Sequence, residues 1–113
     1  MADSDSISAT GMPDGEYMLG INPVVVKNGD ALLRDAPVRA GSTLTLDRAF
    51  KNIMRFSGER MDFCVPPMGQ NQARMLGFGD FFGEIKKGYV ADLNIVDAEG
   101  NVEATFIEGK RVK

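Results

Sequence analysis

The tail of the chain has the pattern that most narrows the fold, because apolar and polar residues alternate there between two turns. The apolar positions are Ala91, Leu93 and Ile95 before a turn at residues 98–101, and Val102, Ala104 and Phe106 after it. A period of two is typical of strands that bury one face. Gly109-Lys110 marks a second turn. The sequence therefore predicts an antiparallel β-meander over residues 90–112 with one buried face.

A second strand pair is predicted upstream. Val24, Val25 and Val26 are β-branched and favour a strand, and Asn28-Gly29 is the preferred pair for a tight hairpin turn. Residues 31–34 then return as the partner strand. We therefore expect a hairpin over residues 23–34.

Helical periodicity is confined to the middle of the chain. Over residues 45–57 the apolar positions share one face, Thr45 can cap the start, and Gly58 suits the end. The next apolar run is interrupted by Pro66-Pro67, which a helix interior does not tolerate. We expect a broken helix, or a turn and a short helix over 70–76, and then a glycine-rich loop.

These elements predict an α+β fold: a small antiparallel sheet from the hairpin 23–34 and the meander 90–112, packed with one or two helices. A length of 113 residues suits one domain over 17–113, with a flexible arm at 1–16. Whether both strand pairs share one sheet stays open. The chain is too short for a complete TIM barrel.

Composition excludes several classes of function. There is no histidine, the commonest metal ligand and the usual acid or base near neutral pH. A net charge of −3 with scattered lysines and arginines argues against nucleic acid. No apolar run is long enough for a membrane span, and the start is unlike a signal peptide. With a single cysteine, Cys64, no internal disulfide can form, so we expect a cytoplasmic protein.

Four segments carry a resemblance to a known family. They are SDSISATGMPDGEYMLG from Ser4, AGSTLTLDRAFKNI from Ala40, NQARMLGF from Asn71 and GEIKKGYVADLNIVDAEGNVEATFIEGKRV from Gly83. In this order they resemble the C-terminal part of N-acetylglucosamine-6-phosphate deacetylase, of the amidohydrolase superfamily. The resemblance spans nearly the whole chain, but only about the last third of a full-length enzyme.

The resemblance implies a metal-dependent (β/α)8 barrel with a small β-sandwich, which removes acetate from N-acetylglucosamine 6-phosphate with a divalent metal such as zinc. It implies that Asp5 is the catalytic aspartate, which activates metal-bound water and then protonates the leaving amine. It also places Gly41, Ser42 and Thr43 near the sugar phosphate. The glutamate and histidine metal ligands of the family lie on barrel strands that this chain lacks, so we expect no metal site and no activity from the chain alone.

Other interpretations stay open for these residues. Asp5 is also explained as a solvated terminal residue, Ser42 and Thr43 as helix caps, and Asp14 and Glu16 as solvated turn residues rather than an acid/base pair. Without a histidine to activate it, Cys64 is best explained as a small buried residue. The alternative functions are a non-catalytic module that binds a sugar phosphate, or a structural module that forms a homo-oligomer or joins a companion barrel chain. We expect the chain to be either a truncated reading frame or a trimmed form of a longer one.

Overall fold

The structure, a computed structural model, describes all residues 1–113. The chain divides into two compact units, each described here by itself. The first unit is Asp3–Ala49, and the second is Phe50–Lys113 together with Met1–Ala2. The flexible arm over 1–16 and the single domain over 17–113 stay predictions.

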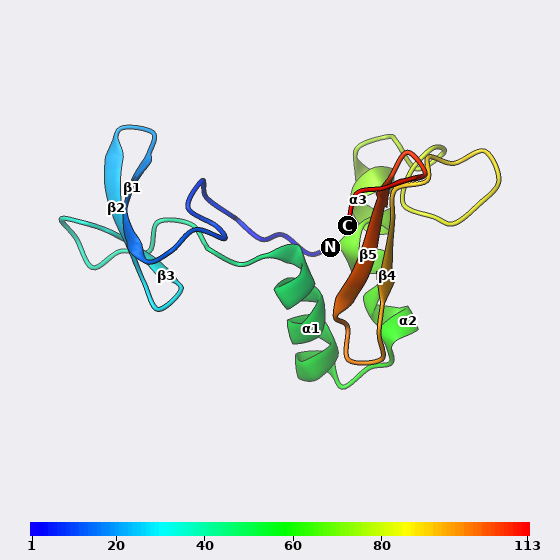
Figure 1. Cartoon of the computed structure of the whole chain (residues 1–113), viewed down its shortest axis with the longest axis horizontal. Coiled ribbons are helices and arrows are strands. Elements are labelled where there is room, and N and C mark those ends of the chain that lie inside the picture. Colours follow the sequence, from blue (N-terminus) through cyan, green and yellow to red (C-terminus); the bar gives the residue numbers. More distant parts are fainter. The chain divides into compact units, whose positions relative to one another are not determined.

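The first unit contains a three-stranded antiparallel sheet in the order β1-β2-β3 (Figure 1). Its strands are β1 (Gly15–Leu19), β2 (Asn22–Lys27) and β3 (Asp30–Leu33). The hairpin predicted over 23–34 is confirmed: Asn28 and Gly29 form its turn with φ of +52° and +78°, and Val26 pairs with Ala31. Strand β1, in which Tyr17 pairs with Val24, was not expected from the sequence.

One face of this sheet has its own small core. Val24 and Val26 of the central strand are buried, and so is Ala31 on the neighbouring strand, whereas the intervening Val25 is only half-buried. Ala9 from the segment that precedes β1 is buried in the same cluster. Alternating burial along β2 is what a strand with one covered face requires.

The predicted helix over 45–57 is confirmed as α1 (Leu46–Ser57). Gly58 follows it with φ of +67°, and its N–H donates to the carbonyl of Met54 at 3.1 Å. Glycine adopts this left-handed backbone at little cost, which explains the end of the helix.

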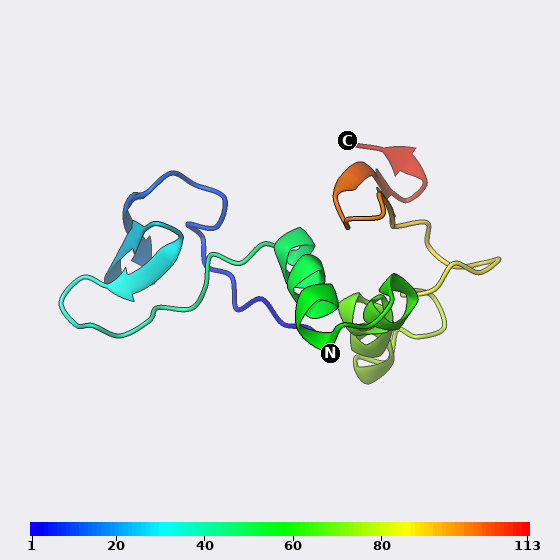
Figure 2. The same ribbon diagram turned by 90° about the horizontal axis from the view of Figure 1, so that it is seen from below.

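The second apolar run is broken, as predicted. It consists of α2 (Met61–Cys64), the 3₁₀ turn η1 (Pro66–Met68) and α3 (Gln70–Met75). Two prolines at the start of η1 are tolerated because the first N–H groups of a helix have no internal acceptor. Residues 77–88 then contain no helix or strand (Figure 2).

The predicted meander is confirmed as a second three-stranded sheet in the order β4-β5-β6. Its strands are β4 (Leu93–Val96), β5 (Val102–Ile107) and β6 (Lys110–Arg111). The two strand groups form separate sheets, which answers the question that the sequence left open. The α+β class, with antiparallel sheets, helices and no closed barrel, is confirmed.

One detail of the predicted meander is wrong. Ile95 was expected on the buried face, but its side chain is half exposed, and Val96 is more buried. The pairing register shifts between Ile95 and Val96. The bulge places Val96 opposite Val102, which explains the burial of Val96 and which a strict alternation cannot anticipate.

Helix α1 contacts the turn between β4 and β5 within the second unit. Lys51 Nζ donates to the side-chain oxygen of Asn101 at 2.5 Å. Gly100 is buried with φ of +80°, and a Cβ atom there would lie 2.7 Å from Met54 Cε. The helix and the turn therefore meet where only a glycine fits without movement of Met54.

Candidate functional site around Asp5

The first unit brings Asp5 to the Gly41–Thr43 segment, two candidates that lie far apart in the sequence. The N–H of Ser42 donates to the carbonyl of Asp5 at 2.8 Å, and the N–H of Ile7 donates to the carbonyl of Ser42 at 2.9 Å. These bonds form an isolated parallel bridge between Ser6 and Ser42. The structure therefore places Asp5, Gly41 and Ser42 side by side.

Gly41 makes this close approach feasible. Its φ is +66°, and a Cβ atom there would lie 2.6 Å from Ile7 Cγ2 and 2.9 Å from the carbonyl oxygen of Asp5. The same Cβ position is 3.7 Å from Asp5 Oδ2, so the carboxylate lies near the glycine. A side chain at position 41 would push against the backbone of Asp5 itself.

The hydroxyl groups around this bridge are engaged within the protein. Ser6 Oγ donates to the carbonyl of Leu44 at 2.5 Å, and Thr10 Oγ1 donates to the carbonyl of Ser42 at 3.2 Å. Thr43 Oγ1 donates to the carbonyl of Gly29. Ser42 Oγ accepts the N–H of Leu44 at 2.7 Å. These contacts tie the segment to the N-terminal residues and to the hairpin turn.

The carboxylate of Asp5 faces solvent. Asp5 is exposed, its backbone has φ of +48°, and its N–H donates to Asp3 Oδ1 at 3.1 Å. A positive φ is uncommon outside glycine, although aspartate tolerates it better than most residues. The chemistry that Asp5 offers is that of an accessible carboxylate, able to accept or return a proton.

Asp14 and Glu16 do not form an acid/base pair. Asp14 Oδ2 accepts the N–H of Asn28 at 2.7 Å and so supports the hairpin turn. Glu16 lies 3.8 Å from the guanidinium of Arg34. Both residues are exposed, but the predicted turn location is wrong for Glu16, which lies in strand β1, and each residue has a structural partner.

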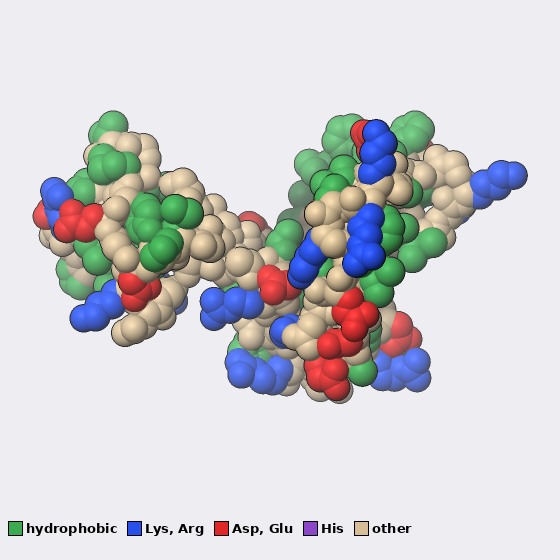
Figure 3. All heavy atoms as spheres, in the orientation of Figure 1, with side chains coloured by type: hydrophobic (Ala, Val, Ile, Leu, Met, Phe, Trp, Pro, Cys, Tyr) green, Lys and Arg blue, Asp and Glu red, His purple; other side chains and the backbone are tan.

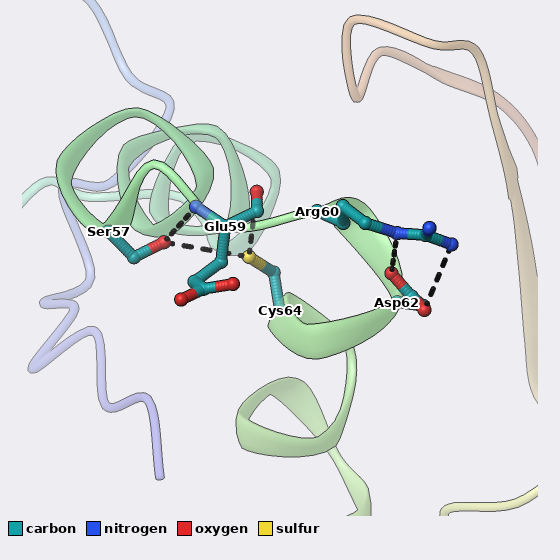
Figure 4. Close-up of polar contacts among 5 residues, drawn as sticks. All are labelled: Ser57, Glu59, Arg60, Asp62 and Cys64. Carbon is teal, nitrogen blue, oxygen red and sulfur yellow. Dashed lines mark hydrogen bonds and ion pairs between the residues drawn. The ribbon is translucent and has the colours of Figure 1, made fainter.

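Cys64 is the small buried residue that the sequence predicts. Only 1% of it is exposed, and its Sγ lies 3.9 Å from Ser57 Oγ and 4.0 Å from the carbonyl of Glu59 (Figure 4). The neighbouring charges are committed to each other, because Arg60 Nε lies 3.1 Å from Asp62 Oδ1 (Figure 4). The contacts of the thiol are with a hydroxyl and a backbone carbonyl, which suits a small buried packing residue.

The residues present do not fit a complete site for a divalent metal. No group of three or more histidine, cysteine, aspartate or glutamate side chains lies close enough to hold an ion. Asp5 contributes a single carboxylate. No chemical step is therefore assigned to a metal held by this chain.

Sequence reasoning missed three members of the site, namely Ser6, Ile7 and Thr10. A bridge between distant segments has no local signature, so composition and periodicity could not reveal these contacts. The only available signal was the run of small polar residues around Asp5, which also suits an ordinary turn.

No helix in the structure is both long and apolar enough to span a membrane. The search against family models finds no match.

The comparisons point to enzymes that deacetylate amino-sugar phosphates. A crystal structure from Thermotoga maritima is 39% identical, with a TM-score of 0.87, over 96% of this chain and 30% of that one. That structure is of an N-acetylglucosamine-6-phosphate deacetylase. The deacetylase of the same name from Caenorhabditis elegans is 33% identical over 109 residues, which are 96% of this chain and 26% of that protein.

A third relative is shorter. The putative N-acetylgalactosamine-6-phosphate deacetylase from Escherichia coli K12 is 31% identical over 107 residues, which are 95% of this chain and 64% of that protein. The homologues of this chain are N-acetylglucosamine-6-phosphate deacetylases and this related enzyme, and the chain spans about a quarter of the length of the first of them. The resemblance noted in the sequence is thus confirmed, and the fold matches a part of the deacetylase.

Proposed function

We propose that this chain is the C-terminal part of a metal-dependent N-acetylglucosamine-6-phosphate deacetylase, acts in amino-sugar catabolism in the cytoplasm, and is inactive alone. The observation that carries the proposal is the match over 96% of the chain to 30% of a solved deacetylase, with a TM-score of 0.87. A match of this kind indicates a segment whose fold is retained. The match covers 30% of that enzyme, so in the proposal the rest of the active site is supplied by residues that this chain does not match.

Asp5 is the residue of this chain that takes part in the proposed reaction. Amide hydrolysis needs a group that removes a proton from the attacking water and returns one to the leaving amine. A carboxylate is ionised at neutral pH and can take that proton. Asp5 is exposed and close to Gly41, so its carboxylate is accessible to a group supplied from outside the chain.

Inactivity of the chain alone follows from what surrounds Asp5. An exposed carboxylate is a weak base in water, and only a closed, polarised site makes it effective. This chain has no cluster of three or more acidic, cysteine or histidine side chains that could hold a metal ion to polarise the amide. In the proposal such ligands belong to the barrel segment, carried either by a longer form of this protein or by a companion chain.

Binding of a sugar phosphate by Gly41–Thr43 alone receives less support. The hydroxyl hydrogens of Ser6, Thr10 and Thr43 are already donated to backbone carbonyls. An anion would have to compete with these internal bonds. Within the segment, Thr43 Oγ1 donates to the carbonyl of Gly29 and Ser42 Oγ accepts the N–H of Leu44, and these internal bonds favour a role in structural support.

The test is a chimera. The matched segment of the Thermotoga maritima deacetylase is replaced by this chain, and release of acetate from N-acetylglucosamine 6-phosphate is measured beside the isolated chain with and without zinc. We expect turnover from the chimera, none from the isolated chain, and a loss of about a hundredfold or more in kcat from Asp5→Asn in the chimera. Asp35→Asn, an exposed aspartate paired only with Arg34, is the matched control.

Two results would contradict the proposal. A well-folded chimera without turnover would show that the segment does not serve a deacetylase. Turnover by the isolated chain that Asp5→Asn abolishes would show that it is an enzyme by itself.

A further inference from the structure

Asp5 has an unusual backbone conformation. The only long-range backbone hydrogen bond to Asp5 comes from the Gly41-Ser42 segment. Its φ is +48°, in the left-handed region, and its side chain is exposed. A local bond, from its own N–H to Asp3 Oδ1, spans only two residues. The long-range bonds run through Ser42, whose N–H and carbonyl hold Asp5 and Ile7.

We propose that Gly41 and Ser42 are positioning residues, which hold the Asp5 carboxylate in its orientation through the backbone rather than by binding substrate. The proposal rests on the proposed function, in which Asp5 is the reacting carboxylate. It gives the Gly41–Thr43 segment a role different from contact with the sugar phosphate.

The two hydrogen bonds at Ser42 lie on either side of Ser6, and the first of them holds the carbonyl of Asp5. Ser42 donates to the carbonyl of Asp5 at 2.8 Å and accepts from the N–H of Ile7 at 2.9 Å. These bonds fix the Asp5–Ser6 and Ser6–Ile7 peptide planes, and the Ser4–Asp5 plane is held by the bond from the Asp5 N–H to Asp3 Oδ1. Because the side chain leaves the backbone between fixed planes, its direction is fixed up to rotation about its own bonds.

Gly41 permits this bridge by its lack of a side chain. A Cβ atom at position 41 would lie 2.9 Å from the carbonyl oxygen of Asp5, the same oxygen that accepts from Ser42. That oxygen cannot retreat without rotation of the Asp5 peptide. A side chain at 41 therefore acts directly on the conformation of Asp5, and not only on the loop.

The side chain of Ser42 is used inside the loop. Its Oγ accepts the N–H of Leu44 at 2.7 Å, and Thr43 Oγ1 donates to the carbonyl of Gly29. These bonds shape the segment into the form that presents the backbone of Ser42 to Asp5.

The first experiment uses the full, isotopically labelled chain without any substitution. The scalar coupling across the hydrogen bond from the Ser42 nitrogen to the Asp5 carbonyl carbon is measured by NMR. We expect a measurable coupling and slow amide exchange at Ser42 and Ile7. Absence of the coupling, with fast exchange at both amides, would overturn the proposal.

The second experiment compares Gly41→Ala with Gly20→Ala. Both glycines have a left-handed φ, +66° and +60°, but nothing lies within 4 Å of a Cβ at Gly20. The control therefore carries the backbone strain alone. We expect Gly41→Ala to raise exchange at Ser42 and Ile7 about tenfold more than the control, and to shift the Cβ and carboxyl carbon signals of Asp5.

The sheet provides an internal reference for these variants. Exchange at Val24 and Val26 should stay slow in both, because the β2 core does not depend on the bridge. Unchanged Asp5 carbon signals in a folded Gly41→Ala chain would overturn the proposal. So would saturable shifts at Gly41 to Thr43 on titration with inorganic phosphate, since they would indicate a binding loop.

The chimera separates this proposal from the proposed function. In an active chimera, Gly41→Ala should lower kcat about tenfold or more with little change in KM, because orientation of the reacting group is lost rather than substrate affinity. Gly20→Ala should retain both values. An inactive chimera would end the proposed function, while the coupling and the exchange rates would still decide whether Gly41 and Ser42 position Asp5.

Discussion

The two three-stranded sheets of this chain have the same simple strand order but very different burial. In the first sheet the central strand buries Val24 and Val26 completely or nearly so, and Ala31 beside them is buried too. In the second sheet Ala104 is the one strand residue that is buried. Its larger neighbours, Val102 and Phe106, remain half-buried.

The difference lies in what covers each sheet. The first sheet is covered by a segment of its own unit, which brings Ala9 and Ile7 onto the face of Val26. The second sheet meets helix α1 chiefly at the Gly100 turn, and many large apolar side chains of its unit remain exposed (Figure 3). Cohesion in the second unit therefore depends more on close contacts at a few turns than on a continuous core.

Among the predicted variants, Gly83→Ala in the second unit is expected to lower the free energy of unfolding most. Gly83 has φ of +87°, and a Cβ atom there would lie 2.7 Å from Gln70 Cα and 3.2 Å from Ala73 Cβ. The backbone of α3 cannot move away from the added Cβ atom as easily as a flexible side chain could. Strain and overpacking together should lower the free energy of unfolding of this unit by about 3 kcal/mol, measured by urea denaturation followed at its amide signals.

Gly88→Ala is the matched control, because Gly88 has φ of +91° but nothing lies within 4 Å of its Cβ position. It should cost about 1 kcal/mol, the backbone term alone. Equal losses in the two variants would mean that the contact with α3 does not stabilise the unit. The comparison between a core-based unit and a turn-based unit would then fail.

The second-largest loss of stability is expected from Val24→Ala in the first unit. Val24 is completely buried on the central strand. Loss of two buried methyl groups and the cavity left behind should destabilise this unit by about 2 kcal/mol. Val38→Ala, at a residue that is 54% exposed, should change the free energy of unfolding far less. Similar values for both variants would show that the first sheet has no effective core.

A smaller effect is expected from Asp14→Ala. The carboxylate of Asp14 accepts the N–H of Asn28 at 2.7 Å in the hairpin turn, but the contact is exposed. Its loss should cost about 0.5–1 kcal/mol and speed exchange at Asn28. Asp14→Asn retains an acceptor oxygen and should recover much of the loss. If alanine and asparagine behave alike, the hydrogen bond does not support the turn.

The same contrast explains how much of the fold could be predicted from the sequence. The hairpin and α1 were predictable because Asn28-Gly29 and Gly58 mark their ends by local backbone preferences. Strand β1 was not, because its pairing with β2 depends on neighbours rather than on its own pattern. The bulge after Ile95 was missed for a similar reason.

In the candidate site, too, contacts between distant segments could not be predicted from the sequence. Asp5 and Gly41–Thr43 were identified by resemblance, and their catalytic and binding roles stay predictions. Their contact could not be read from either segment, because the Ser6–Ser42 bridge joins distant parts of the chain. The positive φ of Asp5 was not predicted either, although aspartate adopts it more readily than most residues.

The smallest change in stability is expected at acid pH, where the second unit loses the contribution of Glu84. The Gln70 amide donates to Glu84 Oε1 at 2.8 Å and holds the pKa of that carboxyl below its ordinary value of 4.5, and the Arg74 guanidinium adds to the effect. A lowered pKa means that the unfolded chain binds the proton more readily. The contribution of Glu84 to stability is therefore complete above about pH 4.5 and is lost as the pH falls through the lowered pKa.

Glu84→Gln should remove this part of the pH dependence, measured as the urea midpoint of the second unit between about pH 3 and 6. Glu103→Gln, at an exposed glutamate on β5, controls for the loss of one negative charge. Because Glu84 follows Gly83 in the segment that packs on α3, the two variants test the same contact by charge and by shape. Suppose that Glu84→Gln leaves the pH dependence of the urea midpoint unchanged, while Gly83→Ala strongly destabilises the unit. This result would mean that only the close packing of the loop against α3, and not the charge of Glu84, stabilises their contact. If Glu84→Gln instead removes the pH dependence of the urea midpoint, the hydrogen bonds from Gln70 and Arg74 contribute to stability as well.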